Sequence, residues 1–296
     1  MKPIARILAA TDLSAPARHA VERGFLVATA TGARYSVLHA LELDTMDSMR
    51  EWLGDNLDGV KRKLEDQARE TLSQQLHTAA RDVTADALIA LGAPLATIIE
   101  RADAMDADLL VLGAHGGNFL RHLALGSMAS RLLRKTTRHP VLVVKQAPHE
   151  PYRRLLLPVD FSPVSAQAIR FARQLAPAAD IVLLHTFEAP FEGKLTYAGV
   201  EESVIQRYRD TARAEALRHM RLLAEQTALD SSDYTPVVVH GDPSQQIIAQ
   251  EQELDCDLIV MGKQGTHVTE ELLLGSVTKH VLAESQGDVL VICGAR

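Results

Sequence analysis

The chain has 296 residues, of which 47% are hydrophobic and 4% aromatic, and it carries a formal net charge of −7. The length suits one large or two ordinary domains, the composition favours helices packed on strands, and the charge argues against a nucleic-acid-binding protein. No run reaches the ~18 apolar residues of a membrane span, and the first residues lack a long apolar segment, so we expect a cytoplasmic protein without membrane contact.

Short apolar runs alternate with longer amphipathic stretches in the first half of the chain. Strands are predicted near residues 5–10, 34–41, 83–90, 108–113 and 140–145, and helices near 14–31, 57–80, 94–105 and 127–137. The runs are apolar throughout, which predicts strands covered on both faces. Ser14 and Asp242 are candidate N-caps, and Pro94, Pro163 and Pro243 suit a first helical turn. The alternation predicts a doubly wound parallel α/β sheet, which binds ligands at the carboxyl ends of its strands.

The second half of the chain repeats the first in the same order. The stretch "KPIARILAATDLS" (2–14) matches "EPYRRLLLPVDFS" (150–162), and "ADLLVLGAHG" (107–116) matches "CDLIVMGKQG" (256–265). Copies of ~145 residues have an ordinary domain size, so we predict domain 1 at 1–147 and domain 2 at 152–296. Residues 1–148 hold 18 Lys and Arg against 17 Asp and Glu, whereas residues 149–296 hold 13 against 21. The first copy should therefore tolerate an anionic ligand better.

A glycine pattern follows the fourth predicted strand of each copy, as "VLGAHGGNFLRHLALGS" (111–127) and "VMGKQGTHVTEELLLGS" (260–276). Gly113 and Gly116 stand where the chain leaves the sheet, where glycine permits positive φ and a close approach of the backbone to a ligand. Gly126 and Ser127 precede a helix, whose first amides form an anion site. The pattern therefore predicts a polyphosphate site, to which His115, Arg121 and His122 would add positive charge.

Asp12 ends the first predicted strand, and Asp160 is its counterpart. A carboxylate would repel a phosphate, so Asp12 is expected to contact a ribose or base, or to hold a divalent cation. The alternative is that both aspartates are only helix caps. Likewise, a single glycine pattern could be a structural loop, although two copies in the same context favour phosphate binding.

Other chemistry has little support in the sequence. Cys256 and Cys293 form no disulfide framework and suit buried packing. The histidines lack metal-ligand spacing, so no dedicated metal site is expected, and His39 and His185 are interpreted as core or supporting residues. No residue is predicted to be catalytic, since there is no G-x-S-x-G and no base at a defined spacing from Ser127 or Ser276. The loops with Trp52, Phe191 and Tyr197 are candidate lids or dimer contacts.

The spacing G-x2-G-x9-G-[ST] resembles the ATP-binding signature of the universal stress protein family, and both copies match it. "ATDLS" and "PVDFS", "LHALE" and "LLHTFE", "GAP" and "GDP", and the closing "HPVLVV" resemble other segments of that family. The resemblance covers nearly the whole chain. It implies two tandem five-stranded, Rossmann-like sheets of the adenine nucleotide α-hydrolase type, packed as a pseudo-dimer through their closing strands. A homodimer of the whole chain is a further expectation. The second copy has Asp288 in place of Pro140 at the closing strand. This departure bears on the expected geometry of the sheet edge there and not on the expected fold.

The resemblance also implies a set of nucleotide-binding residues in each copy. The adenine side comprises Ala10, Thr11, Asp12 and Ala40, and in the second copy Val159, Asp160 and Thr186. The ribose and phosphate side comprises Leu112, Gly113, His115, Gly116, Arg121, Gly126, Ser127 and Met128, and in the second copy Met261, Gly262, Gly265, Gly275, Ser276 and Val277. The expected cofactor is ATP, or AMP or ADP, with Mg or Mn often accompanying it in the family.

The leading functional hypothesis is a stress protein that binds ATP or AMP as a structural or regulatory ligand. Binding is expected mainly in the first copy, because the second has Glu270 and Glu271 between its motif glycines and fewer cations in the helix that follows. Lys263 is expected to compensate in part. The alternatives are a slow ATP hydrolase, a nucleotide-transferring enzyme on the same scaffold, and a protein-interaction module without nucleotide.

Overall fold

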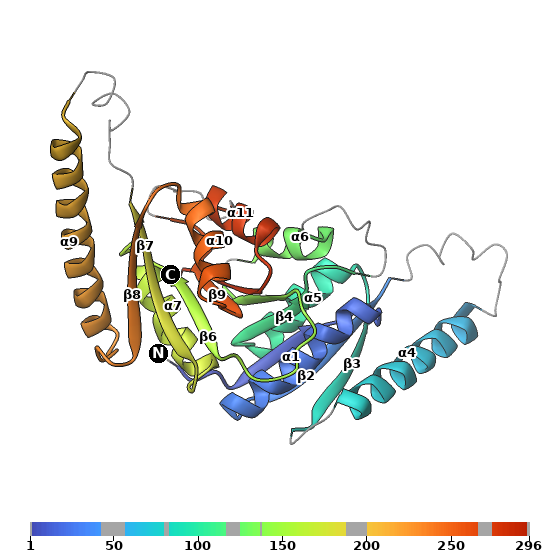
Figure 1. Ribbon diagram of the computed structural model, residues 1–296. Helices are drawn as coiled ribbons and strands as arrows, with labels where there is room; N and C mark the ends of the chain where they lie inside the picture. The colour runs from blue at the N-terminus through green and yellow to red at the C-terminus, as the bar shows by residue number, and fades with distance from the viewer. Residues whose placement is uncertain are drawn as a thin grey trace.

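The computed structural model describes residues 2–42, 57–79, 83–116, 125–136, 138–187, 200–265 and 274–294. The first half contains β1 (Arg6–Ala10), α1 (Ala15–Thr31), β2 (Arg34–Leu41), α4 (Leu57–Ala79), β3 (Ala85–Leu91), α5 (Pro94–Met105), β4 (Leu109–Gly113), α6 (Ser127–Lys135) and β5 (Val141–Val144). Figure 1 shows these elements in chain order. The strands and helices predicted in this half are confirmed, with ends that agree within two residues.

The second half repeats the arrangement. It contains β6 (Arg154–Pro158), α7 (Pro163–Leu175), β7 (Asp180–Phe187), α9 (Glu202–Gln226), β8 (Tyr234–His240), α10 (Pro243–Glu253), β9 (Leu258–Gly262), α11 (Ser276–Glu284) and β10 (Asp288–Ile292). The predicted caps are present. Ser14 accepts a hydrogen bond from the amide of Ala17, Asp242 accepts one from Gln245, and prolines occupy the first turns of α5, α7 and α10.

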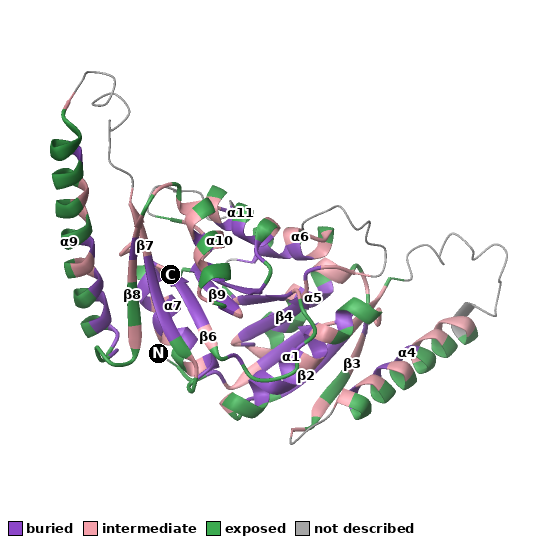
Figure 2. Cartoon of the chain, in the orientation of Figure 1, coloured by how far each residue is buried: buried purple, intermediate pink, exposed green. Residues whose placement is uncertain are grey.

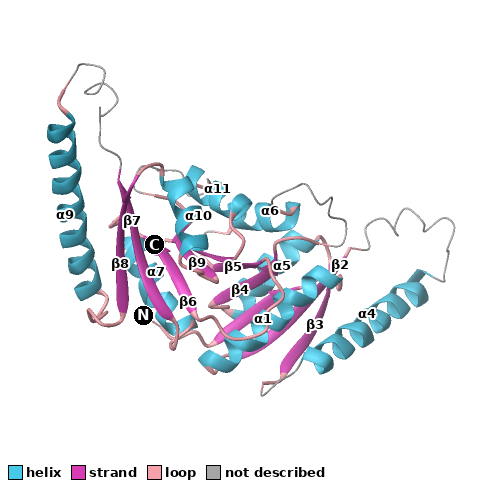
Figure 3. Cartoon of the chain, viewed as in Figure 1, coloured by secondary structure: helices cyan, strands magenta, loops and turns pink. Residues whose placement is uncertain are grey.

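The strands form one ten-stranded sheet in the order β3-β2-β1-β4-β5-β10-β9-β6-β7-β8. Pairing is parallel within each half, and the two predicted five-stranded sheets are joined because β5 pairs antiparallel with β10. In Figure 3 the sheet continues from β4 and β5 of the first half to β9 of the second. The closing strands thus form the contact between the halves.

Helices cover both faces of the sheet, as the apolar strands predict. Side chains of α1, α4, α7 and α9 pack in one core, and those of α5, α6, α10 and α11 pack in another across the sheet. Leu109, Leu110 and Val111 on β4 are almost completely buried. Figure 2 shows purple central strands between the layers and green outer faces on α4 and α9. Within the described ranges, no helix combines the length and apolar character needed to cross a membrane.

Candidate functional site

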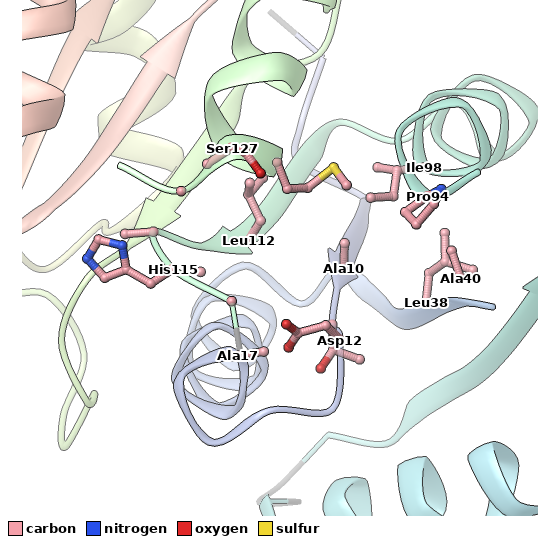
Figure 4. Close-up of a pocket in the computed structure, with 17 residues that line it drawn as sticks. Ala10, Asp12, Ala17, Leu38, Ala40, Pro94, Ile98, Leu112, His115 and Ser127 are labelled. Atoms are coloured by element: carbon pink, nitrogen blue, oxygen red, sulfur yellow. The ribbon is translucent and has the colours of Figure 1, made fainter. Parts of the chain in front are cut away.

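A cavity of about 380 Å³ opens at the carboxyl ends of β1 and β4 in the first half. These neighbouring strands lie where the strand order reverses, which is the usual binding position in a doubly wound sheet. Figure 4 shows Asp12 and Ser127 on opposite walls, with apolar side chains from β2 and α5 at one end. The predicted residues that line the cavity are Ala10, Thr11, Asp12, Ala40, Leu112, Gly113, His115, Gly116, Gly126, Ser127 and Met128. Arg121 lies outside the described residues.

The second half has the corresponding cavity, of about 340 Å³. All the residues predicted for this copy line it, namely Val159, Asp160, Thr186, Met261, Gly262, Gly265, Gly275, Ser276 and Val277. Other lining residues were not predicted, including Ile98 and Pro94 on α5 and their counterparts Ile247 and Pro243 on α10. The two prolines are the last residues of the matching "GAP" and "GDP" turns, so the repeat itself holds the signal that identifies them.

The turn after β1 fixes the position of Asp12. The Asp12 carboxylate accepts a 3.0 Å hydrogen bond from the amide of Ser14, and Ser14 rather than Asp12 is the N-cap of α1. Leu13, between them, has a φ of 63°, and Phe161 has 61° at the same place in the second half. Such a conformation is uncommon for a large side chain, and strained residues of this kind cluster at functional sites. Asp12 is therefore not the N-cap of α1, although its carboxylate closes the turn before that helix, and its contact with a ligand stays a prediction.

The glycine loop comprises residues 113–116 with Gly126 in the first half, and residues 262–265 with Gly275 in the second. In the first half, its backbone segments lie against each other at the cavity wall. The amide of Gly126 donates a 2.7 Å hydrogen bond to the carbonyl of Ala114. A Cβ atom on Gly126 would lie 2.8 Å from that carbonyl oxygen, and one on Gly116 would lie 2.7 Å from Asp12 Oδ2. Positive φ is found instead at Gly32, Gly92 and Gly241. The expectation of positive φ in the pattern is thus wrong, and close approach is what requires glycine here.

The helix that follows each glycine loop begins without a side-chain cap. Gly126 and Gly275 are the N-caps of α6 and α11, so the N-cap residue itself supplies no side-chain hydrogen bond, and neither helix has an acidic residue in its first turn. The first amides of a helix lack intrahelical partners and carry a partial positive charge. The loop and the helix start therefore offer hydrogen-bond donors to an anion in the cavity.

Comparison with known proteins identifies the family of this chain. The model of the universal stress protein family matches residues 3–145 and again residues 151–292. The chain belongs to the universal stress protein family. Universal stress protein MJ0577 of Methanocaldococcus jannaschii is 27% identical over 48% of this chain and 94% of its own. Universal stress protein Rv2005c of Mycobacterium tuberculosis is 26% identical over 77% of each chain. The crystal structure of a universal stress protein from Archaeoglobus fulgidus has the same fold, with a TM-score of 0.67, 19% identity and 97% coverage of both chains.

The two halves of this universal stress protein differ at the strand-end aspartate. In the second half Ser165, which replaces Ala17, donates a 2.7 Å hydrogen bond from Oγ to Asp160 Oδ1. Burial alone would raise the pKa of Asp160, but hydrogen bonds from Ser162 and Ser165 outweigh it and the pKa is lowered. Ala17 has no hydroxyl group with which to do the same for Asp12. The second aspartate is therefore restrained by a neighbour that the first lacks.

Lys263 does not face the second cavity, although it lies between two of the motif's glycines. Its Nζ donates to the carbonyl oxygens of Thr136, at 2.8 Å, and Arg134, at 3.2 Å, both at the end of α6 in the first half. The residue is 4% exposed. The expectation that Lys263 adds positive charge to the second site is therefore wrong, because its ammonium group lies between the halves.

Two histidines support the strand ends of this universal stress protein. Nδ1 of His39 lies 2.9 Å from the carbonyl oxygen of Thr11, and Nδ1 of His185 lies 2.8 Å from that of Val159. These contacts agree with the interpretation of both as supporting residues. In the part of the chain that the structure describes, no three His, Cys, Asp or Glu side chains come together as a metal site.

Proposed function

We propose that this universal stress protein binds an adenine nucleotide, ATP or AMP, mainly in its first half, as a structural or regulatory ligand. The observation that carries the proposal is the first cavity. It combines an apolar wall, the carboxylate of Asp12, and an uncapped helix start with glycines that admit close approach. These are the features that an adenine, a ribose and a phosphate chain need, respectively.

Each part of the nucleotide has residues suited to it. Ala10, Leu38 and Ile98 would contact the adenine, and Asp12 would accept hydrogen bonds from the ribose. The amides at Gly116 and at the start of α6 would hold the phosphates, with the hydroxyl group of Ser127 beside them. Mg or Mn would enter with the phosphates as their counter-ion.

The preference for the first half rests on charge. Helix α6 carries Arg131, Arg134 and Lys135, whereas Lys279 is the only Lys or Arg of α11. Lys263 directs its ammonium group away from the second cavity. The halves also differ in overall charge, and a positive field favours a polyphosphate.

A matched pair of glycine variants tests the proposal. In Gly126→Ala the new Cβ would lie 2.8 Å from a backbone oxygen, whereas in Gly275→Ala it would lie 3.4 Å from one. Backbone must shift in the first variant, so we expect about tenfold weaker Mg-ATP binding by calorimetry, equal to about 1.4 kcal/mol. The second variant should bind like the wild type. Thermal unfolding without ATP shows whether each variant is folded.

The ligand itself is tested by mass spectrometry of small molecules released from the purified protein, where ATP, ADP or AMP is expected. The reverse pattern, with binding lost in Gly275→Ala and kept in Gly126→Ala, would assign the nucleotide to the second half. A wild-type protein that neither releases nor binds an adenine nucleotide would contradict the proposal. Multiple-turnover release of phosphate at enzymic rates would show an ATPase instead of a binding protein.

A further inference from the structure

The side chains of two lysines, Lys263 and Lys145, contact the half of the molecule opposite to their own. Nζ of Lys263, in the second half, reaches the last carbonyl groups of α6 in the first, with Thr136 O at 2.8 Å. Nζ of Lys145, after β5 in the first half, donates to the carbonyl oxygen and to Oγ of Ser285, both at 2.7 Å. Ser285 is the C-cap of α11 in the second half. Each half thus places an ammonium group on the end of a helix in the other.

Both contacts are at the ends where a cation stabilises a helix. The last carbonyl groups of a helix lack intrahelical partners and carry partial negative charge. The opposite ends of α6 and α11, at Ser127 and Ser276, are the starts that line the two cavities. Helix α6 has nine residues and is therefore about 13 Å long, so each lysine lies one short rigid helix from the other half's cavity.

Each lysine is also attached to the glycine loop of its own half. The carbonyl oxygen of Lys263 accepts a 3.0 Å hydrogen bond from the amide of Gly275, in the second loop. Lys145 follows Val144, whose carbonyl oxygen accepts a 2.7 Å hydrogen bond from Ala114 in the first loop. A shift of either loop would therefore move a lysine that holds the helix of the other site.

The two connections are reciprocal, but they do not come from equivalent positions of the repeat. The counterpart of Lys263 in the first half is Ala114, and the counterpart of Lys145 in the second is Cys293. Neither counterpart can supply an ammonium group. Cys293 Sγ lies 3.7 Å from the same Thr136 carbonyl oxygen that Lys263 contacts. The two lysine contacts therefore come from different positions of the repeat, although each places an ammonium group on a helix end of the other half.

We propose that Lys263 and Lys145 are positioning residues that couple the two cavities, so that a nucleotide bound in one changes the affinity of the other. This inference rests on the proposed function. When phosphates draw a glycine loop toward them, the lysine attached to it shifts the far helix and with it the amides at that helix's start. Because such coupling is reciprocal, the same factor applies in both directions.

The test compares the ATP affinity of the second site when the first site is occupied with its affinity when the first site is blocked. Ala40→Trp is designed to fill the first cavity and Thr186→Trp the second, since both residues line the cavities at strand ends. Calorimetry with Mg-ATP gives the affinity of the second site in the wild type and in Ala40→Trp. We expect the two affinities to differ by about fivefold or more. The ratio should fall toward one in Lys263→Met and in Lys145→Met.

Controls separate positioning from general damage. Lys263→Arg keeps a cationic donor and should keep most of the ratio, and Thr186→Trp confirms which affinity belongs to which site. Where ATP binds the first half alone, hydrogen exchange at Val277 and Thr278, at the start of α11, provides the measurement. ATP should change that exchange in the wild type and not in Lys145→Met, each compared with its own ligand-free protein.

The outcomes are distinct. Two occupied sites with a wild-type ratio of one, or a ratio unchanged in both lysine variants, would overturn the coupling and leave the proposed function standing. First-site binding with no change of exchange in α11 would do the same. A wild-type protein that binds no ATP would overturn the proposed function and the coupling together.

Discussion

The hydroxyl group of Tyr152 donates a 2.6 Å hydrogen bond to the carboxylate of Asp288, where the linker meets the first residue of β10. The same carboxylate accepts from Arg23 Nε at 3.1 Å and from the amide of Lys145 at 2.8 Å. Asp288 is 1% exposed, and the Arg23 guanidinium lies 4.0 Å from the centre of the Tyr152 ring. The residue that replaces the closing-strand proline therefore binds the linker, α1 and β10 together, while its pairing with β9 is kept.

Asp288→Asn should destabilise the protein strongly. The change leaves the buried guanidinium of Arg23 without its counter-charge, and loss of one partner of a buried ion pair costs about 3–5 kcal/mol. Tyr152→Phe removes one hydrogen bond to a charged group and should cost about 1.5–3 kcal/mol. Urea unfolding at neutral pH measures both values.

Two controls accompany these variants. Arg153→Ala removes an exposed ion pair with Glu150 and should cost less than about 1 kcal/mol. Joint replacement of Arg23 by Met and Asp288 by Leu should recover much of the stability lost in Asp288→Asn, since an apolar pair needs no partner. An Asp288→Asn protein as stable as the wild type would show that the buried carboxylate is dispensable.

Gly116→Ala and Gly265→Ala form a second matched pair. A Cβ atom on Gly116 would lie 2.7 Å from Asp12 Oδ2, whereas one on Gly265 would lie 3.5 Å from Asp160 Oδ2. The Asp12 carboxylate can turn aside at little cost in folding, so stability should hardly change. Its displacement from the ribose position should weaken Mg-ATP binding about tenfold, or about 1.4 kcal/mol.

Calorimetry and thermal unfolding of both variants check this prediction. Gly265→Ala should match the wild type in both measurements, because its Cβ makes an ordinary contact. Equal ATP affinity of Gly116→Ala and the wild type would show that Asp12 does not need its observed position.

The site could be predicted from the sequence where its geometry is local. Asp12 follows β1, Gly113 ends β4 and Ser127 starts α6, so the order of elements in a parallel sheet brings all three to one edge. The second copy has the same order of elements, so the corresponding residues are predicted there as well.

What the sequence did not reveal depends on contacts between distant segments. From its position between two glycines, Lys263 is expected in a phosphate-binding loop, but the antiparallel pairing of β5 with β10 brings it beside the end of α6. The need for glycine also depends on such contacts, since close approach is decided by which backbone lies opposite. Ser165 reads as an ordinary first-turn residue, and only the fold of the turn directs its hydroxyl group to Asp160.

Ser165→Ala should raise the pKa of Asp160. Burial already favours the neutral carboxyl, and the variant removes one of the hydrogen bonds that keep the pKa below its usual 3.8. A lowered pKa contributes stability that is present above the unfolded value and is lost as pH falls through the folded value. The variant should therefore lose part of that contribution at neutral pH. Carboxyl NMR titration measures the pKa directly, with Ser203→Ala, on exposed α9, as a control that should not move it.

Stability at alkaline pH should distinguish Lys145 from a surface lysine. Burial lowers the pKa of Lys145 from 10.5 to about 8, although Glu251, Asp288 and Glu284 oppose the shift. Between these two values the unfolded chain holds a proton that the folded protein has released. This contribution to the free energy of unfolding therefore rises with pH, at most by about 1.4 kcal/mol per pH unit.

Urea unfolding of the wild type and Lys145→Met at about pH 7 and about pH 9.5 isolates this contribution, because other groups titrate alike in both proteins. The free energy of unfolding of the wild type should rise with pH relative to that of the variant. Lys2→Met is the control, since hydrogen bonding to Asp106 raises the pKa of Lys2 and leaves it charged in both states throughout the window. A stability difference between wild type and Lys145→Met that stays constant, or that shrinks with pH, would mean that the ammonium group is not buried as the structure has it.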